Sequence, residues 1–157
     1  MRSSSELMNP SDYPSDCPWV TSVGATRLYP NQTVLDAESA MAVDMWQPGG
    51  SEADHHFASG GGFSNYFPTP AYQRSTLSAY FREHDPGYPT YVANADASNI
   101  GIDGGRYNRA GRGFPDVSAN GAFMLAYVNQ TLGRQVGSSL AAPIWAAVVT
   151  LVNQQRK

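Results

Sequence analysis

The sequence has one cysteine, few charged residues and no long apolar run. Because Cys17 is the only cysteine among 157 residues, it cannot form a disulfide within the chain. No apolar run approaches the roughly 20 residues that span a bilayer, so no membrane-spanning segment is expected. Charged residues make up 15% of the chain, the net charge is -3 and no basic stripe is present. Neither nucleic acid nor a membrane is therefore expected as a partner.

Secretory and ligand-binding motifs are also incomplete. Residues 1–10 are polar and Ser-rich and lack an apolar signal core, so a signal would have to lie upstream. Two Asn-x-Thr sequons, at Asn31 and Asn129, would accept glycans in a secretory pathway. The glycine run at 60–62 lacks the Lys-Ser/Thr of a phosphate loop. The pair His55 and His56 has no ligand cluster at metal spacing, so no metal site is predicted.

Glycine, proline and tyrosine are abundant, with 15, 11 and 9 residues, which is typical of one turn-rich mixed domain. Residues 1–16 are predicted to be an irregular lead-in, and residues 17–157 the domain itself. A short buried strand is predicted at 19–23, followed by a long surface excursion at 27–52. The glycines and aromatics of 57–67 indicate a loop in which the backbone passes close to another segment.

The second half has clearer periodicity. Residues 71–84 carry Leu77, Tyr80 and Phe81 at helical spacing, and a glycine-rich loop is expected to follow over 87–113. Two strands are predicted at 114–119 and 123–128, joined by a turn at residues 120–121. Apolar residues at helical spacing over 139–155 predict a final helix packed against a sheet.

The strongest chemical signal lies where this last helix begins. Residues 137–143 read Gly-Ser-Ser-Leu-Ala-Ala-Pro. A hydroxyl there lies among unpaired backbone N–H groups at the positive end of the helix dipole, which stabilises a developing oxyanion. Serine is also a common helix N-cap, and position alone favours that structural role for Ser138 or Ser139.

Four blocks in order resemble the sedolisin family of serine-carboxyl peptidases, in particular its fungal tripeptidyl-peptidase-like members. Residues 137–143 resemble the family's Gly-Thr-Ser-x-Ser-x-Pro motif, with Ser139 at the nucleophile, Ser138 in place of threonine and Ala141 in place of the second serine. The other blocks resemble the family's Cys-Pro-x-Val-Thr strand, its Ser-Gly-Gly-Phe-Ser loop and its Tyr-Asn and Gly-Arg-Gly-x-Pro-Asp-Val stretch; they lie at residues 17–26, 57–64 and 107–119.

The resemblance implies an α/β, subtilisin-like three-layer fold with a mostly parallel sheet, present only as its C-terminal portion. It implies a secreted or acidic vacuolar or lysosomal peptidase, acting on peptides or proteins and monomeric when complete. In this family a glutamate is the general base, an aspartate orients it, and a further aspartate completes the oxyanion hole. A carboxylate base remains usable in acid, where an imidazole is protonated.

The partners of Ser139 do not match. Neither Glu6 with Asp12 nor Glu52 with Asp54 has the family's Glu-x-x-x-Asp spacing, and no Ser-Gly-Asp motif is present. Calcium is expected for the family, but its ligands would follow the final helix and are absent from this chain. Ser139 is therefore the one catalytic residue carried over, while Asp116 is expected to hydrogen-bond loop backbone.

Two interpretations follow. The first is a serine-type, acid-acting tripeptidyl-peptidase or endopeptidase that works through an acyl-enzyme at Ser139, with this chain inactive alone because the carboxylates are missing. The alternative is an inactive truncated remnant or binding module that retains the fold. Unpaired strand edges and apolar faces would make such a chain marginally stable.

Overall fold

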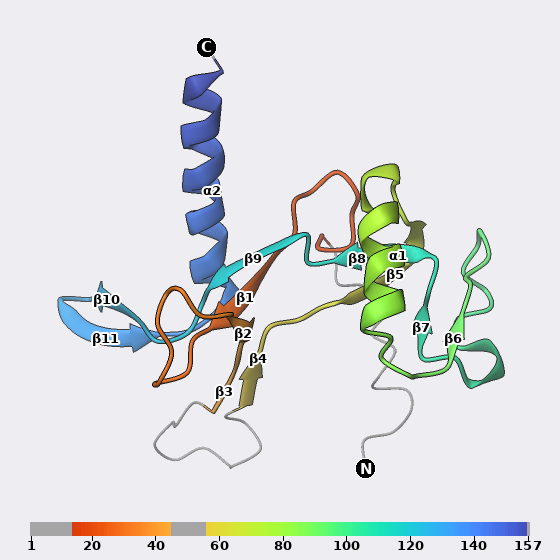
Figure 1. The fold of residues 1–157 in the computed structure, drawn as a ribbon, viewed down its shortest axis with the longest axis horizontal. Coiled ribbons are helices and arrows are strands. Elements are labelled where there is room, and N and C mark those ends of the chain that lie inside the picture. Colours follow the sequence, from red (N-terminus) through yellow and green to blue (C-terminus); the bar gives the residue numbers. More distant parts are fainter. Residues whose placement is uncertain (1–13, 45–55, 157) are drawn as a thin grey trace. The chain divides into compact units, whose positions relative to one another are not determined.

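The computed structural model describes residues 14–44 and 56–156 (Figure 1). The chain divides into two compact units, which are described separately. The first unit comprises Met1–Ser22 and Gly61–Asp116, and the second comprises Val23–Gly60 and Val117–Lys157. Each unit is thus assembled from segments that are far apart in the sequence.

A small mixed sheet forms the centre of the second unit. Strand β1 (Val23–Arg27) pairs in parallel with β9 (Val117–Asn120) and antiparallel with the two-residue β2 (Ser39–Ala40). A separate antiparallel pair is formed by β3 (Ala42–Asp44) and β4 (His56–Ala58). The first predicted strand is therefore misplaced, because the chain turns at residues 14–20 and pairing with β9 begins at Val23.

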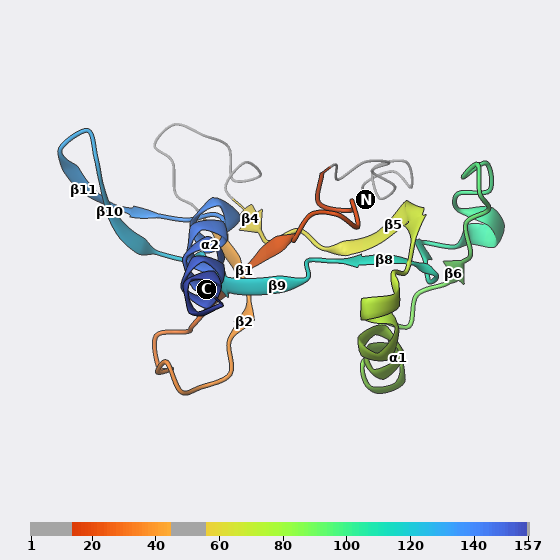
Figure 2. The same ribbon diagram turned by 90° about the horizontal axis from the view of Figure 1, so that it is seen from above.

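Helix α2 (Ser138–Gln155) lies against β1 and β9 near its first turns. Figure 1 shows the rest of the helix extending away from the sheet, and Figure 2 looks along its axis. Ala141 is fully buried there, in a cluster with Ala25, Met41, Val43 and Ala122. The predicted final helix is confirmed, and it begins one residue earlier than expected.

Beyond its first turns, α2 exposes much of its apolar surface. Four apolar side chains near its C-terminal end are exposed: Val148, Val149, Leu151 and Val152. A helix that is apolar around its circumference is normally buried in a larger core. Within the described residues, no helix is long and apolar enough to cross a membrane. This surface agrees with the expectation of exposed apolar faces.

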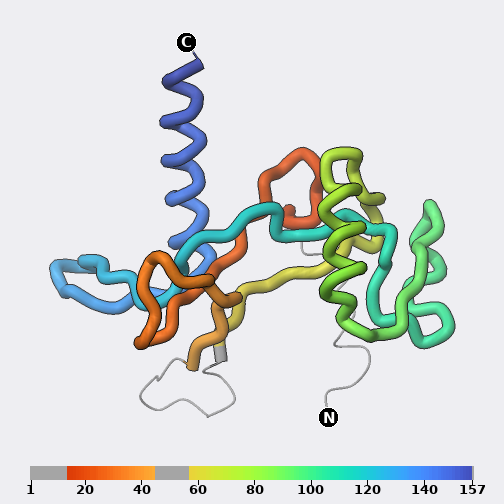
Figure 3. The backbone as a smooth tube through the Cα atoms, in the orientation of Figure 1, coloured from red at the N-terminus to blue at the C-terminus, as the bar shows by residue number. Residues whose placement is uncertain are grey.

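The predicted hairpin between residues 114 and 128 is wrong in its pairing. Strand β10 (Met124–Val128) pairs antiparallel with β11 (Thr131–Gln135), and the resulting hairpin extends away from β9 in Figure 3. Its turn residues Asn129 and Gln130 both have positive φ, 49° and 62°, as a type I′ turn requires. The chain at residues 120–121 connects β9 to this separate hairpin instead of reversing between two paired strands.

The first unit is built around the antiparallel strands β5 (Gly62–Pro68) and β8 (Gly111–Phe114). The single loop predicted for residues 57–67 is thus wrong, because most of it lies in β4 and β5. The expected close backbone approach is present, since Gly62 pairs with Phe114. The predicted helix at 71–84 is confirmed as a 3₁₀ turn, η2 (Ala71–Gln73), followed by α1 (Arg74–Glu83).

The glycine-rich segment after α1 is mostly loop, as predicted, with three short elements. Strands β6 (Thr90–Tyr91) and β7 (Tyr107–Asn108) pair in parallel, and η3 (Ile102–Gly104) lies between them. Two buried side chains anchor this segment. The Asn108 amide donates to the Ser64 carbonyl at 2.8 Å, and the Tyr91 hydroxyl donates to the Asn65 side chain.

Burial raises the pKa of Tyr91 above its ordinary value, which predicts a loss of stability in alkali. The phenol of an unfolded chain ionises near pH 10, so the contribution of Tyr91 is fully present below about pH 10. It is lost as the pH rises through the higher folded-state pKa. The free energy of unfolding, measured in urea from pH 8 to 11, should fall less steeply for Tyr91→Phe than for the unsubstituted chain.

Burial also raises the pKa of Tyr107, so Tyr91→Phe should reduce the alkaline loss without abolishing it. Tyr66→Phe removes an exposed phenol from the same unit and serves as the control. An identical alkaline slope for Tyr91→Phe and the unsubstituted chain would contradict the assignment.

The α/β class is confirmed. The sheet around β1 is smaller and more mixed than the mostly parallel sheet expected, since one of its two pairings is antiparallel. Cys17 is a free thiol, as its being the only cysteine requires.

Candidate active site

Ser139 lies in the first turn of α2, and its side chain is exposed. The residue before the helix is Gly137, which is the N-cap and offers no side chain to the first N–H groups. Its φ of 147° and ψ of 150° fall in a region that is essentially restricted to glycine. The sequence therefore places an accessible hydroxyl directly after a turn that glycine permits.

A hydrogen-bonded chain of backbone groups fixes this turn. Gly121 follows β9; its N–H donates to the Thr26 carbonyl at 3.0 Å, and its carbonyl accepts the Gly137 N–H at 2.8 Å. The start of α2 is thereby tied to the ends of both β1 and β9. A nucleophile at this position would be held by the sheet as well as by its own helix.

Side chains of α2 hold the same end of the helix against the sheet. Ala141 is completely buried, and the Trp145 indole N–H donates to the Ser118 carbonyl of β9 at 2.8 Å. The turn that packs against the start of α2 also needs a small residue, because a methyl group added to Gly121 would lie 2.6 Å from the Gly137 oxygen. The alanine that replaces the second serine of the family motif, Ala141, thus occupies a tightly packed position.

The first turn of α2 is suited to stabilising negative charge. The Leu140 N–H donates to the Gly137 carbonyl at 3.0 Å, while the N–H groups that open a helix generally have no partners within it, and the helix dipole is positive at this end. Pro143 lies inside the helix and has no N–H, so it cannot donate to the carbonyl of Ser139 four residues earlier. An oxyanion formed next to the Ser139 hydroxyl would meet backbone donors at this end.

Within the described part of the second unit, the Ser139 hydroxyl has no hydrogen-bond partner, so no carboxylate of this unit is bonded to it there. The poorly matching pairs Glu6 with Asp12 and Glu52 with Asp54 lie outside the described residues. The described part of the second unit thus places an exposed Ser139 hydroxyl without a carboxylate bonded to it.

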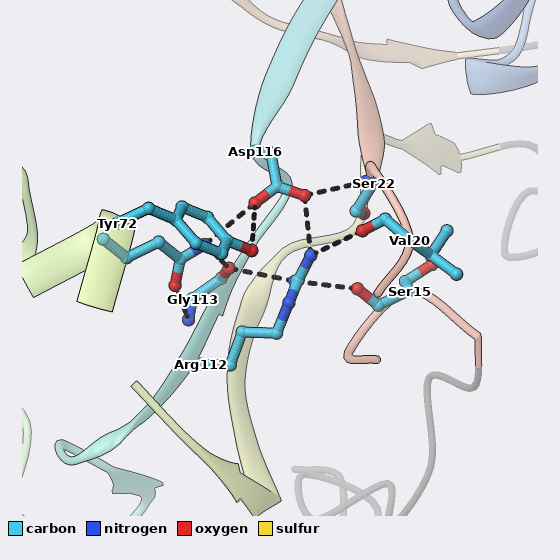
Figure 4. Close-up of polar contacts among 8 residues, drawn as sticks. Ser15, Val20, Ser22, Tyr72, Arg112, Gly113 and Asp116 are labelled. Carbon is cyan, nitrogen blue, oxygen red and sulfur yellow. Dashed lines mark hydrogen bonds and ion pairs between the residues drawn. The ribbon is translucent and has the colours of Figure 1, made fainter. Parts of the chain in front are cut away.

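Asp116 belongs to the first unit, where it is the centre of a polar network (Figure 4). One carboxylate oxygen accepts the Ser22 N–H at 2.8 Å and an Arg112 nitrogen at 2.6 Å. The other accepts the Gln73 amide at 2.9 Å and lies 3.5 Å from the Tyr72 hydroxyl. The expected bond from Asp116 to loop backbone is confirmed.

Sequence reasoning missed the two main partners of Asp116. The Arg112 side chain is completely buried; besides Asp116, it donates to the carbonyls of Ser15, Val20 and Gly113 at 2.9, 2.9 and 3.1 Å. Gln73 is also buried and exchanges two hydrogen bonds with the Gly113 backbone. The only available signal was the interval of four residues between Arg112 and Asp116 within one motif.

The described residues do not fit a calcium ion. No group of three or more histidine, cysteine, aspartate or glutamate side chains lies together in residues 14–44 and 56–156. His55 and the side chain of His56 fall outside the described part.

Comparison with known proteins gives consistent matches over nearly the whole chain. The sequence is 42% identical to aorsin of Aspergillus oryzae over 144 residues, which is 92% of this chain and 21% of that protein. It is 37% identical to tripeptidyl-peptidase sed1 of Aspergillus fumigatus, over 92% of this chain and 20% of the relative.

A third match extends beyond the fungi. The chain is 32% identical to physarolisin of Physarum polycephalum, over 93% of this chain and 24% of the relative. No family model matches the sequence. The chain thus spans between a fifth and a quarter of the length of these curated relatives, and it belongs to the sedolisin family.

Proposed function

We propose that this chain carries the nucleophile of a sedolisin-type serine peptidase, an acid-acting tripeptidyl-peptidase or endopeptidase. The observation that carries the proposal is the exposed Ser139 in the first turn of α2, held after Gly137 in a chain 42% identical to aorsin. The substrate is a peptide or protein, and the relatives named tripeptidyl-peptidases favour the release of tripeptides.

The chemistry follows from this position. The Ser139 hydroxyl oxygen attacks the carbonyl carbon of the scissile bond, its proton passes to a carboxylate base, and backbone donors at the helix start stabilise the oxyanion. The leaving amine takes up the proton as the acyl-enzyme forms, and water then hydrolyses that ester. A carboxylate base keeps this pathway open in acid, which fits an extracellular, vacuolar or lysosomal location.

The isolated 157-residue chain should have little or no peptidase activity. A serine hydroxyl without a base is a poor nucleophile, and in the described part of the second unit no carboxylate is hydrogen-bonded to Ser139. Robust acid peptidase activity of the purified chain, abolished by Ser139→Ala, would overturn this part of the proposal.

A chimera tests the nucleophile itself. In this chimera, the segment of tripeptidyl-peptidase sed1 of Aspergillus fumigatus that aligns with this chain is replaced by the sequence of this chain. The release of tripeptides is measured between pH 3 and 6. The chimera should be active, and Ser139→Ala should lower the rate by about 10⁴-fold or more, as nucleophile removal does in serine peptidases. Labelling by a fluorophosphonate probe should disappear with the same substitution.

Ser138→Ala is the matched control, because it removes the neighbouring hydroxyl in the same turn and should leave labelling intact. If a folded, active chimera kept its activity after Ser139→Ala, Ser139 would not be the nucleophile. A folded chimera with neither turnover nor labelling would instead support the alternative of an inactive remnant or binding module.

A further inference from the structure

The first unit contains an aromatic pocket of about 820 Å³, whose lining residues have no role in the proposed function. The pocket lies between η2, α1, the loop that follows α1 and the strands β5, β7 and β8. Its volume is within the range of about 300 to 1,000 Å³ that is usual for pockets holding small ligands. Six aromatic residues line it: Phe63, Tyr72, Tyr80, Tyr88, Tyr107 and Phe114.

One wall of this aromatic pocket is built from rings that fix one another. Phe63 packs against Tyr107 with ring centroids 5.2 Å apart and against Tyr80 at 6.3 Å. Phe81 stacks behind them, 5.2 Å from Phe63 and 6.1 Å from Tyr107. Rings held in this way present a preformed apolar surface that loses little conformational freedom when a ligand binds.

Other rings of the pocket are open to solvent. Tyr72 and Tyr88 are 59% and 56% exposed, and Tyr80 is 38% exposed. Tyrosine gives a large contact area at a low entropic cost, which is why it is enriched at recognition sites. An aromatic ring of a ligand could therefore be covered from more than one side.

The charged side chains that line the pocket favour a negatively charged ligand. The Asp116 carboxylate lines it but is neutralised by Arg112 at 2.6 Å. The Arg106 guanidinium also lines it, 5.4 Å from the centroid of the Tyr88 ring. In the described residues Arg106 has no ion-pair partner, whereas Arg82 and Arg109 of the same unit pair with Glu83 and Asp85.

We propose that this pocket binds the C-terminal aromatic residue of a peptide, with the ring among the tyrosines and the carboxylate on Arg106. A guanidinium matches a carboxylate through two parallel hydrogen bonds, and the Arg106 guanidinium lies over the Tyr88 ring at the edge of this site. Ser139 is not among the residues that line the pocket, and the inference does not rest on the proposed function.

Binding of short peptides to the full 157-residue chain tests the site. The chain carries Ser139→Ala, so that no ligand is consumed, and acetyl-Gly-Phe is titrated at pH 6, where its carboxyl is ionised. Calorimetry gives the affinity, and NMR shifts of the Tyr72, Tyr80 and Tyr88 rings give the location. Acetyl-Gly-Phe-amide should bind about tenfold more weakly, because it loses the charge-assisted bonds.

The Arg106→Gln variant should weaken acetyl-Gly-Phe about tenfold and leave the amide nearly unchanged. Arg82→Gln is the control, since it removes a paired arginine of the same unit that does not line the pocket. Acetyl-Gly-Ala, which lacks the ring, should bind more weakly than acetyl-Gly-Phe. Equal affinities of acid and amide, no effect of Arg106→Gln, or no binding at millimolar concentration would each overturn the proposal.

Discussion

Replacing Arg112 by methionine should destabilise the first unit by about 3 to 5 kcal/mol, which is the usual effect of breaking a buried charge pair from one side. The arginine side chain has no exposure to solvent and holds the Asp116 carboxylate at 2.6 Å. Methionine fills much of the same space, but the carboxylate loses its ion partner and keeps only neutral donors, and the carbonyls of Ser15 and Val20 lose the Arg112 donor. Urea unfolding, followed by circular dichroism, measures the loss.

Two further variants distinguish the loss of this hydrogen-bond network from the simple loss of a positive charge. Arg82→Met removes an arginine whose side chain is 68% exposed and paired only with its neighbour Glu83, so it should change stability by less than about 0.5 kcal/mol. Arg112→Met combined with Asp116→Asn should cost less than the sum of the two single changes, because both remove the same contact. If the free energy of unfolding of Arg112→Met lay within about 1 kcal/mol of that of the unsubstituted chain, a structural role for the pair would be contradicted.

The same network explains why the two ends of the first unit stay together. Arg112 and Asp116 contact backbone of residues 15–22, which are about 90 positions away in the sequence. The Asp116 N–H also returns a bond to the Ser22 carbonyl at 2.9 Å. Hydrogen exchange at the Ser22 and Asp116 amides should therefore accelerate together when Arg112 is replaced.

The helices could be predicted from the sequence because their signals are local. Leu77, Tyr80 and Phe81 recur at the spacing of one helix face, and the run from Leu140 to Leu151 does the same. In α1 the three residues face the aromatic pocket or its wall, as the pattern requires. The signal for a helix lies within the segment that forms it, so contacts with distant residues mainly change where the helix begins and ends.

The strands were harder to predict because their partners lie far away. The β-branched run ending at Val23 looks like a strand, yet Trp19 is 90% exposed and the ladder starts at Val23, where Val117 becomes its partner. Asn120-Gly121 looks like a hairpin turn, yet the backbone of Gly121 is bonded to Thr26 and Gly137. Nothing within either segment indicates those long-range bonds.

The candidate site divides in the same way. The resemblance located Ser139, and the exposed helix start agrees with it, because both depend on a short contiguous motif. The backbone bonds through Gly121 that position this motif, and the Arg112 network in the other unit, join residues tens of positions apart. Contacts of that kind cannot be read from spacing alone.

Gly121→Ala should disrupt the turn that precedes α2 in the second unit. The added carbon would lie 2.6 Å from the Gly137 oxygen and 2.7 Å from the Ala25 side chain, so the turn before α2 must move. Overpacking of this kind costs about 1 to 3 kcal/mol. In the active chimera the effect on rate should be larger, about 10²-fold, since a shift of about 1 Å would misplace Ser139, the proposed nucleophile.

Gly133→Ala in β11 is the matched control, because its added carbon would meet only the end of the Gln135 side chain, at 3.4 Å. It should leave stability within about 0.5 kcal/mol and the rate unchanged. If Gly121→Ala only destabilised the fold, it would lower the yield of folded chimera, and each folded molecule would keep its rate. Displacement of Ser139 requires instead that kcat per folded molecule falls, so an unchanged kcat for Gly121→Ala would show that the turn through Gly137 does not position the nucleophile.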